Sequence, residues 1–402
     1  MHNTFLMRIF GVGEGWEYQS TKYVNGGTEI HLKARKAAIR CPISGSDDIT
    51  LHGTRERRVR SVPIGFKHVT FVVHVPRCFS RETGKFFDFS PSFAPRGCSY
   101  TLGLARFVAG LFRIMSMTDL AAFTGLSWDT VKRIASCHMA KDVGKIDLKK
   151  VHFLSIDEVY LGKLHKFITI VINWESGQIL YVAKGKGENA LRPFFRRLRM
   201  AKAKIKAVST DLSAAYAAAV RNCMPKTLWV ADRFHVIKLM NEKISKLRCA
   251  LQREADTMGR KVLKGTRYLL LRGRENLKPE RIPALEEALK LNEPLSQAYY
   301  LKEDLRTMWD FKDIKKMTEF FDDWCRRAKD TGVPLLASLG KTLRGFRSGI
   351  LNGWVYPISN GKLEGINNKI GAMQRMHYGL RDFTFLSLRL LTLHKAKRNF
   401  CG

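Results

Sequence analysis

From about residue 150 onward, short apolar runs alternate with longer amphipathic segments, and this alternation constrains the fold more than any other feature. Runs rich in β-branched residues predict strands. The first three runs follow one another closely, whereas helical patterns separate the last three. A meander followed by helix–strand repeats predicts a mixed α/β sheet. The predicted strands are 152–157, 166–173, 178–183, 205–211 and 227–232.

Three of these runs end on an aspartate, namely Asp157, Asp211 and Asp232. Carboxylates at strand ends can meet at one edge of a sheet, where Mg²⁺ finds the hard oxygen ligands that it prefers. Glu158 directly follows Asp157. Because neighbouring strand residues point to opposite faces, we expect only Asp157 to join such a site. A strand-terminal aspartate is also a common turn or capping residue, so this pattern alone leaves both interpretations open.

The charge balance points to a polyanionic partner. The chain has 70 Lys and Arg against 36 Asp and Glu, a formal net charge of +34, which favours nucleic acid. A secreted cationic protein or a membrane-surface binder is the alternative. The first ten residues are too interrupted for a signal peptide, and no window approaches about 18 consecutive apolar residues. Eight cysteines without a Cys-x-x-Cys pair indicate reduced thiols. We therefore expect a cytoplasmic protein that binds no membrane.

The first half of the chain has two expected units. Residues 1–98 are basic and β-rich, and residues 99–148 are helical. Within the second, 117–134 fits a helix-turn-helix, with a turn at Gly125 and an N-cap at Ser127. A plain helical hairpin would give the same pattern. In a helix-turn-helix the second helix enters the major groove, so its exposed readers of DNA would be Trp128, Asp129, Lys132 and Arg133.

Beyond the strands the composition changes again. Residues 149–234 hold the predicted strands, and 235–354 are helical and charged, as an insertion or a separate helical domain. Residues 355–402 are helical and basic. Within this last segment Glu364 lies in the first turn of a predicted helix, where a carboxylate suits the helix dipole.

Several short motifs stand in an order typical of one protein family. Each motif alone is weak, but their order and spacing are specific. Together they resemble the DDE transposases of bacterial insertion sequences, in the ISL3 group, from about residue 40 to the C-terminus. The motifs are SIDE at 155–158, STD at 209–211, ADRFHV at 231–236, SNGKLEGINNKI at 359–370 and RMHYGLR at 375–381.

This resemblance implies a ribonuclease-H-like catalytic core, interrupted by a helical insertion. It implies a catalytic, metal-binding triad of Asp157, Asp211 and Glu364, with two Mg²⁺ or Mn²⁺ ions. Asp232 and His235 match a further Asp-x-x-His signature of the family, and we expect them to support the site.

The helix that carries Glu364 offers further candidates. Asn367 lies three residues on and shares the face of Glu364. Lys369 and Arg375 flank this cluster, and we expect them to contact DNA phosphates.

One part of the family pattern is altered. Members usually carry a four-cysteine zinc ribbon near the N-terminus. Here Ser44 follows Cys41, and Arg81 follows Cys78, at the spacing where second cysteines would stand. Two thiolates cannot form a closed structural zinc site, and His52 alone does not replace the missing ligands. We expect a metal-free, zinc-ribbon-like unit that still binds DNA.

The expected function is that of a transposase of a bacterial insertion sequence, associated with the nucleoid. It would bind the terminal inverted repeats, hydrolyse a phosphodiester to free a 3′-hydroxyl, and join that hydroxyl to target DNA. Synapsis of two ends implies a homodimer or higher oligomer. The alternatives are a non-cutting repressor, which includes a domesticated or inactive transposase, and a metal nuclease that cuts without joining.

Overall fold

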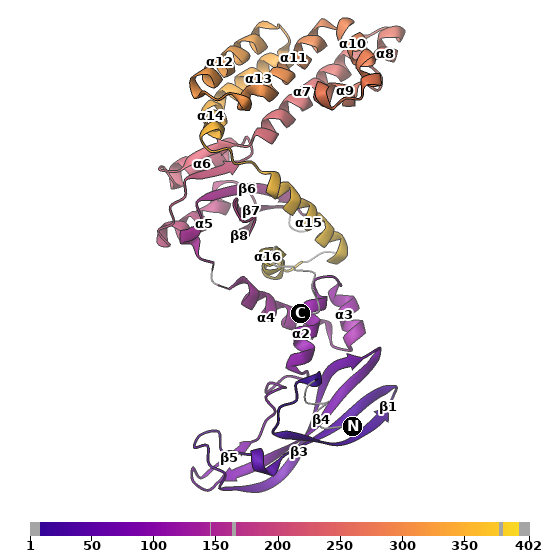
Figure 1. The fold of residues 1–402 in the computed structure, drawn as a ribbon, viewed down its shortest axis with the longest axis vertical. Coiled ribbons are helices and arrows are strands. Elements are labelled where there is room, and N and C mark those ends of the chain that lie inside the picture. Colours follow the sequence, from indigo (N-terminus) through magenta and orange to yellow (C-terminus); the bar gives the residue numbers. More distant parts are fainter. Residues whose placement is uncertain (1–8, 145, 163–165, 378–380, 394–402) are drawn as a thin grey trace. The chain divides into compact units, whose positions relative to one another are not determined.

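The computed structural model describes residues 9–144, 146–162, 166–377 and 381–393. The chain divides into two compact units (Figure 1). The first comprises residues 1–144 and 373–402, and the second comprises residues 145–372. All of 355–402 was expected to belong to the catalytic core, whereas the structure groups the end of this segment with the first unit. Within the described residues, no helix has the length and apolarity that a membrane span needs.

The first unit begins with a five-stranded sheet in the order β1-β2-β4-β3, with β5 paired to β4. β2 and β4 run parallel, and the other pairs are antiparallel. Alternate apolar residues of β2 and β4, among them Leu32 and Phe71, form its core. The strands are β1 (Trp16–Val24), β2 (Gly27–Ala34), β3 (Ile49–Ile64), β4 (Lys67–Ser80) and β5 (Lys85–Asp88).

The predicted helix-turn-helix follows this sheet. The Oγ of Ser116 caps α3, and the Oγ of Ser127 caps α4. Between them Gly125 has φ +67°, a left-handed conformation that glycine adopts without strain. Phe385 of α16 is buried in the same apolar core as these helices. The helices are α2 (Leu102–Leu111), α3 (Met117–Thr124), α4 (Trp128–Val143) and α16 (Phe383–Leu391).

The second unit contains the predicted mixed sheet, in the order β10-β9-β6-β7-β8. β6, β9 and β10 run parallel, and β7 is antiparallel to both neighbours. All five predicted strands are present, and α5 (Glu188–Met200) and α6 (Ala214–Cys223) connect the later ones. The strands are β6 (Phe153–Tyr160), β7 (Phe167–Asn173), β8 (Ile179–Lys184), β9 (Ala207–Thr210) and β10 (Leu228–Ala231).

One strand end differs from its prediction. Asp157 was expected to end a strand, but β6 continues to Tyr160, and Asp157 pairs with Ile170 of β7. The physical reason is that β7 offers backbone partners along this whole length, so the ladder does not stop where the apolar run stops.

A helical region follows β10, as the composition predicts. In its interior Lys302 is fully buried, and its Nζ donates to the carbonyls of Leu270 and Arg272. Trp324 is also buried and donates to the carbonyl of Leu301. The helices are α7 (Arg233–Glu254), α8 (Thr257–Leu263), α9 (Arg267–Leu271), α10 (Ile282–Lys290), α11 (Glu293–Thr307), α12 (Ile314–Asp330), α13 (Pro334–Gly345), α14 (Arg347–Val355) and α15 (Gly361–His377).

Candidate active site

Asp157 is held by two hydrogen bonds in the middle of the second unit. Its Oδ1 accepts from the backbone N–H of Glu158 at 2.8 Å, and its Oδ2 accepts from Nδ2 of Asn367 at 2.9 Å. Asn367 lies on α15, 210 positions along the chain. This contact fixes the orientation of the carboxylate and ties α15 to β6.

Asp211 follows β9 directly and is half-buried. Its Oδ1 is buried and has no hydrogen-bond partner among the described residues. Burial raises the pKa of Asp211 to about 6; His235 opposes this shift, and the acids Glu158, Asp157 and Asp232 add to it. A carboxylate with an unsatisfied oxygen and several acidic neighbours is electrostatically suited to a cation.

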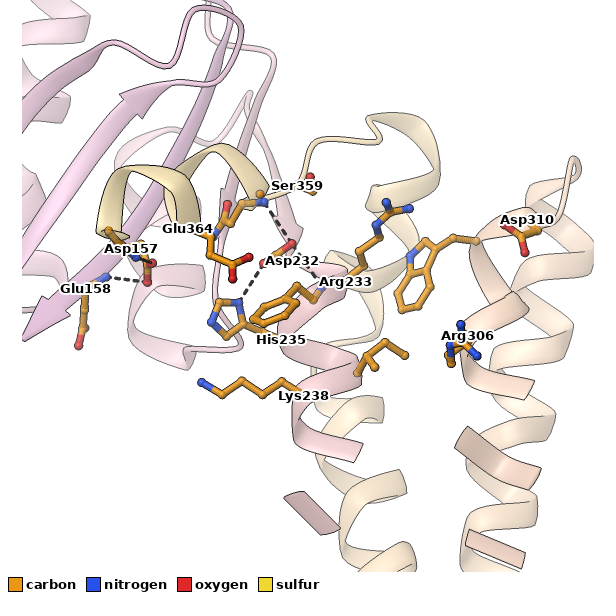
Figure 2. Close-up of a pocket in the computed structure, with 16 residues that line it drawn as sticks. Asp157, Glu158, Asp232, Arg233, His235, Lys238, Arg306, Asp310, Ser359 and Glu364 are labelled. Carbon is orange, nitrogen blue, oxygen red and sulfur yellow. Dashed lines mark hydrogen bonds and ion pairs between the residues drawn. The ribbon is translucent and has the colours of Figure 1, made fainter. Parts of the chain in front are cut away.

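Asp232 follows β10 and is fully buried. Its Oδ2 accepts from Nδ1 of His235 at 3.0 Å, and its Oδ1 accepts from the backbone N–H of Asn360 at 3.2 Å. Figure 2 shows these bonds joining three segments, the end of β10, the start of α7 and the loop before α15. The hydrogen bond to Asp232 raises the pKa of His235, which favours the protonated imidazole.

Glu364 lies in the first turn of α15 and is exposed. The segment before it is held against the end of β7, because Nε1 of Trp174 donates to the carbonyl of Ser359 at 2.9 Å. Nζ of Lys362 donates back to the carbonyls of Trp174 and Glu175, at 2.8 and 2.6 Å. Two further contacts of α15 and its preceding loop, those to Asp157 and Asp232, complete the anchoring of this helix.

A cavity of about 640 Å³ brings these residues together. Figure 2 shows Asp157, Glu364, Asp232 and His235 among the residues that line it, with His235 on the first turn of α7. The lining residues named by sequence reasoning are Asp157, Glu364, Asp232, His235 and Asn367. The remaining member of the expected triad, Asp211, does not line the cavity, although its pKa responds to Asp157.

Glu158 also lines the cavity, so alternation along β6 does not remove it from this region. Its Oε1 accepts from the hydroxyl of the buried Tyr216 at 2.7 Å. That hydroxyl also lies 3.2 Å from Oγ1 of Thr169, and burial raises the pKa of Tyr216. Sequence reasoning missed Tyr216, because no local pattern connects α6 to β6.

The acidic residues fit a divalent cation, but they do not form a closed site. Within the described part of the chain, no group of three His, Cys, Asp or Glu side chains is close enough to hold a metal ion. The unpartnered Oδ1 of Asp211 and the hard oxygen donors of Asp157 and Glu364 are nevertheless the ligand types that Mg²⁺ or Mn²⁺ binds.

The zinc-ribbon expectation is not supported, and the residues around Cys41 group differently from the prediction. The side chain of Cys41 contacts Oγ1 of Thr83 at 3.8 Å. Hydrogen bonds from Ser44, and then from Ser80, lower the pKa of its thiol to about 6. Cys78 is buried elsewhere on β4, with its Sγ 3.8 Å from the carbonyl of Pro76. Cys41 therefore faces the turn at 80–83 and not the 78–81 segment that the zinc-ribbon pattern predicts. The side chains that face its thiol carry hydroxyl groups, whereas a zinc ribbon would place thiolates there.

The predicted DNA-reading residues lie at the start of α4. Trp128 and Arg133 are exposed, and the guanidinium of Arg133 lies over the ring of Tyr100. Nζ of Lys132 lies 2.9 Å from Oδ2 of Asp382, just before α16, and over the ring of Trp128. Lys132 is therefore engaged within the first unit. Both Lys369 and Arg375, on α15, are exposed.

Comparison with known proteins gives a consistent result. A family model described as transposase, of the ISL3 DDE group, matches residues 154–390. A second model, the helix-turn-helix domain of transposase family ISL3, matches residues 90–136.

Two transposases of insertion sequences agree with these matches. The transposase for insertion sequence element IS1001 of Bordetella parapertussis is 30% identical over 394 residues, which cover 96% of this chain and 97% of the relative. The transposase for insertion sequence element IS1557 of Mycobacterium tuberculosis is 26% identical over 367 residues, 85% of this chain and 82% of the relative. Among solved structures, the Drosophila P element transposase strand transfer complex aligns with 73% of this chain and 92% of that chain, with a TM-score of 0.38 and 9% identity.

Proposed function

Because the chain belongs to the ISL3 family of transposases, we propose that it cleaves and joins DNA with Asp157, Asp211 and Glu364 as its catalytic, metal-binding carboxylates. The core that carries them is ribonuclease-H-like, and its mixed five-stranded sheet with a central β6 supports this assignment. The substrates are the terminal inverted repeats of an insertion sequence and a target DNA.

The observation that carries this proposal is the unpartnered, buried Oδ1 of Asp211 among acidic neighbours. The acidic neighbours of Asp211 disfavour its ionised form, which costs stability unless a cation binds among them. A pure DNA-binding protein has no use for them, which argues against the non-cutting alternative. Two Mg²⁺ or Mn²⁺ ions would activate the attacking oxygen and stabilise the leaving oxygen of a phosphodiester.

The chain's own residues orient these groups. Asn367 holds the Asp157 carboxylate in one rotamer through its amide N–H. Asp232 acts as a supporting residue, because its carboxylate fixes both His235 and the loop that leads to Glu364. The remaining ring nitrogen of His235 is left to contact the phosphate or the reacting oxygen.

DNA binding is assigned to the helix-turn-helix and to basic residues of α15. Trp128 and Arg133 are exposed on α4, and Lys132 joins them when its contact with Asp382 opens. Lys369 and Arg375 are proposed to contact phosphates near the cleaved strand. Joining two ends requires a homodimer or larger assembly, in the cytoplasm and on the nucleoid.

The test uses the full chain, DNA carrying the ends found beside its gene, and Mg²⁺ or EDTA. Asp157→Asn, Asp211→Asn and Glu364→Gln should each lower the cleavage rate by at least about 100-fold, since metal ligation is worth several kcal/mol in the transition state. Glu319→Gln, an exposed residue of α12, is the matched control and should cut normally.

Joining of the cut end to a target plasmid distinguishes a transposase from a nuclease. Specific binding of the ends without cleavage, in either Mg²⁺ or Mn²⁺, would instead identify a repressor or an inactive copy.

A further inference from the structure

Two hairpins of the first sheet turn at the same end of that sheet. β2 begins at Gly27, directly after the β1–β2 turn, and β4 begins at Lys67, directly after the β3–β4 turn. Because β2 and β4 are parallel neighbours that pair from close to their first residues, the two turns lie side by side. We call residues 22–26 and 64–67 the hairpin tips.

The hairpin tips carry a cluster of exposed apolar side chains. These side chains are Tyr23, Val24, Ile64 and Phe66. Phe66 is 92% exposed and Tyr23 is 80% exposed. The turn itself needs no phenyl ring, because its left-handed conformation falls on Gly65, at φ +58°. Clusters of exposed apolar side chains mark interaction sites on a protein surface.

The charges on the hairpin tips favour an anionic partner. Lys22 and Lys67 are exposed and form no ion pair with any described residue. Glu29, the acid opposite Lys22 in the ladder, is instead paired with Arg58. A second copy of this chain is a poor partner, because a twofold contact would bring the same lysines together. Positive charge beside apolar side chains fits DNA.

The hairpin tips also adjoin the turn of the helix-turn-helix (Figure 1). The ring of Phe66 meets that of Phe123, on α3, edge-on at 6.2 Å. His68, on β4, lies so close to this turn that a Cβ on Gly125 would come within 3.2 Å of its ring. α4 begins at Trp128, just beyond the turn, and its first residues are those that approach bases in the major groove. DNA held by α4 therefore passes close to the hairpin tips.

We propose that the hairpin tips enter the minor groove next to the major groove that α4 occupies, where Phe66 inserts at a base step and bends the DNA. The inference rests on the proposed function and specifies how the terminal inverted repeat is held. Apolar side chains of minor-groove proteins wedge between base pairs, and the contacts that the bent duplex gains offset the cost of unstacking. Lys22 and Lys67 then lie beside phosphates that border the groove. A flexible step such as TA lowers the cost of the bend.

The experiment measures bend and affinity together. A DNA end with a fluorophore at each terminus reports the bend by energy transfer, and EDTA keeps the DNA uncut. The wild-type full chain should bend the duplex, and Phe66→Ala should abolish most of that bend. The dissociation constant of Phe66→Ala should rise roughly 3- to 30-fold, because the lost apolar burial exceeds the stacking that the DNA recovers. Phe66→Leu, which keeps an apolar wedge, should retain the bend.

Further variants locate the wedge and the phosphate contacts. Phe86→Ala removes an exposed ring from β5, which pairs with the last residues of β4 at the other end of the sheet, and should leave the bend unchanged. Lys22→Gln and Lys67→Gln should each lower the slope of log Kd against log salt by about 0.9 in magnitude and keep the bend. Thermal melting checks that each variant folds.

A modified base tests which groove the hairpin tips enter. Replacing adenine by 2,6-diaminopurine adds an amino group to the minor groove and leaves the major-groove edge as it was. At one position beside the α4 site, this change should weaken binding by the wild type and not by Phe66→Ala. An equal effect on both proteins at every position would contradict the minor-groove assignment.

A bend and an affinity that Phe66→Ala leaves unchanged would overturn the inference. So would self-association of the free protein that Phe66→Ala abolishes, because the hairpin tips would then be a contact between copies of this chain. Cleavage of the same DNA end in Mg²⁺ is assayed separately. Failure to cut would count against the proposed function, while the bend reports on Phe66 alone.

Discussion

Asp211→Asn should stabilise the metal-free protein while abolishing its activity. In the fold, burial of Asp211 and its acidic neighbours disfavour the ionised carboxyl. An asparagine has nearly the same shape and carries no charge. Its amide N–H groups can donate to the surrounding carboxylates, which have acceptors to spare. The same change removes a proposed metal ligand, so stability and activity should move in opposite directions.

The size of the effect follows from the pKa. A rise from 3.8 to about 6 corresponds to about 3 kcal/mol at about 1.36 kcal/mol per unit. Part of the carboxyl touches solvent, so screening reduces the expected gain to about 1–2 kcal/mol. An acid whose pKa is raised in the folded state costs stability as pH rises from 3.8 to about 6, and the full cost remains above that value. The gain from Asp211→Asn should therefore be full near neutral pH and shrink in acid.

Thermal unfolding in EDTA, at about pH 7.5 and about pH 4.5, measures this difference. For a unit of this size the midpoint should rise by about 2–8 °C at the higher pH. Adding Mg²⁺ should raise the midpoint of the wild type but not that of Asp211→Asn, because only the wild type retains its ligand. Asp330→Asn, an exposed aspartate of α12, is the control. A lowered or unchanged midpoint at pH 7.5, or an equal gain at both pH values, would refute the reasoning.

Three other changes address contacts around the site and the DNA-reading helix. Asn367→Ala frees the Asp157 carboxylate, so single-turnover cleavage should fall about 10- to 100-fold with end binding intact; an equal loss of binding would contradict this role. Asp232→Asn removes the charged acceptor of the His235 imidazole. Because this contact raises the pKa of His235, it stabilises the fold at low pH and loses that effect as pH rises through the folded pKa. Its melting deficit should thus be larger at about pH 6 than at about pH 9, and a deficit independent of pH would exclude this cause. Asp382→Asn keeps the cap of α16 but removes the acidic partner of the lysine on α4, so DNA should bind up to about fivefold more tightly in a titration; weaker binding would rule out that lysine as a DNA contact.

Local sequence patterns predicted the strands and the helix-turn-helix well, because apolar runs and capping residues are strong signals of these elements. Apolar runs identified every strand of the second sheet, and Ser127 with Gly125 predicted the turn before α4. The end of β6 was wrong, because strand length depends on the pairing partner as well as on the strand's own residues.

Contacts between distant segments were beyond local patterns. The spacing from Glu364 suggested Asn367, but no pattern predicted that its amide would bind Asp157. The bond from Asn360 to Asp232 likewise joins residues 128 positions apart.

Both compact units need residues from late in the sequence to complete their packing. Phe385 completes the apolar core of the first unit, and α15 brings Glu364 and Asn367 to the second. These residues follow all the strands and most of the helices in the chain, so a ribosome makes them later than those elements. Each unit therefore reaches its final packing only after α15 and α16 have been synthesised. A premature stop codon before Gly361 would remove a buried part of the first unit's helical core together with Glu364, a proposed catalytic carboxylate.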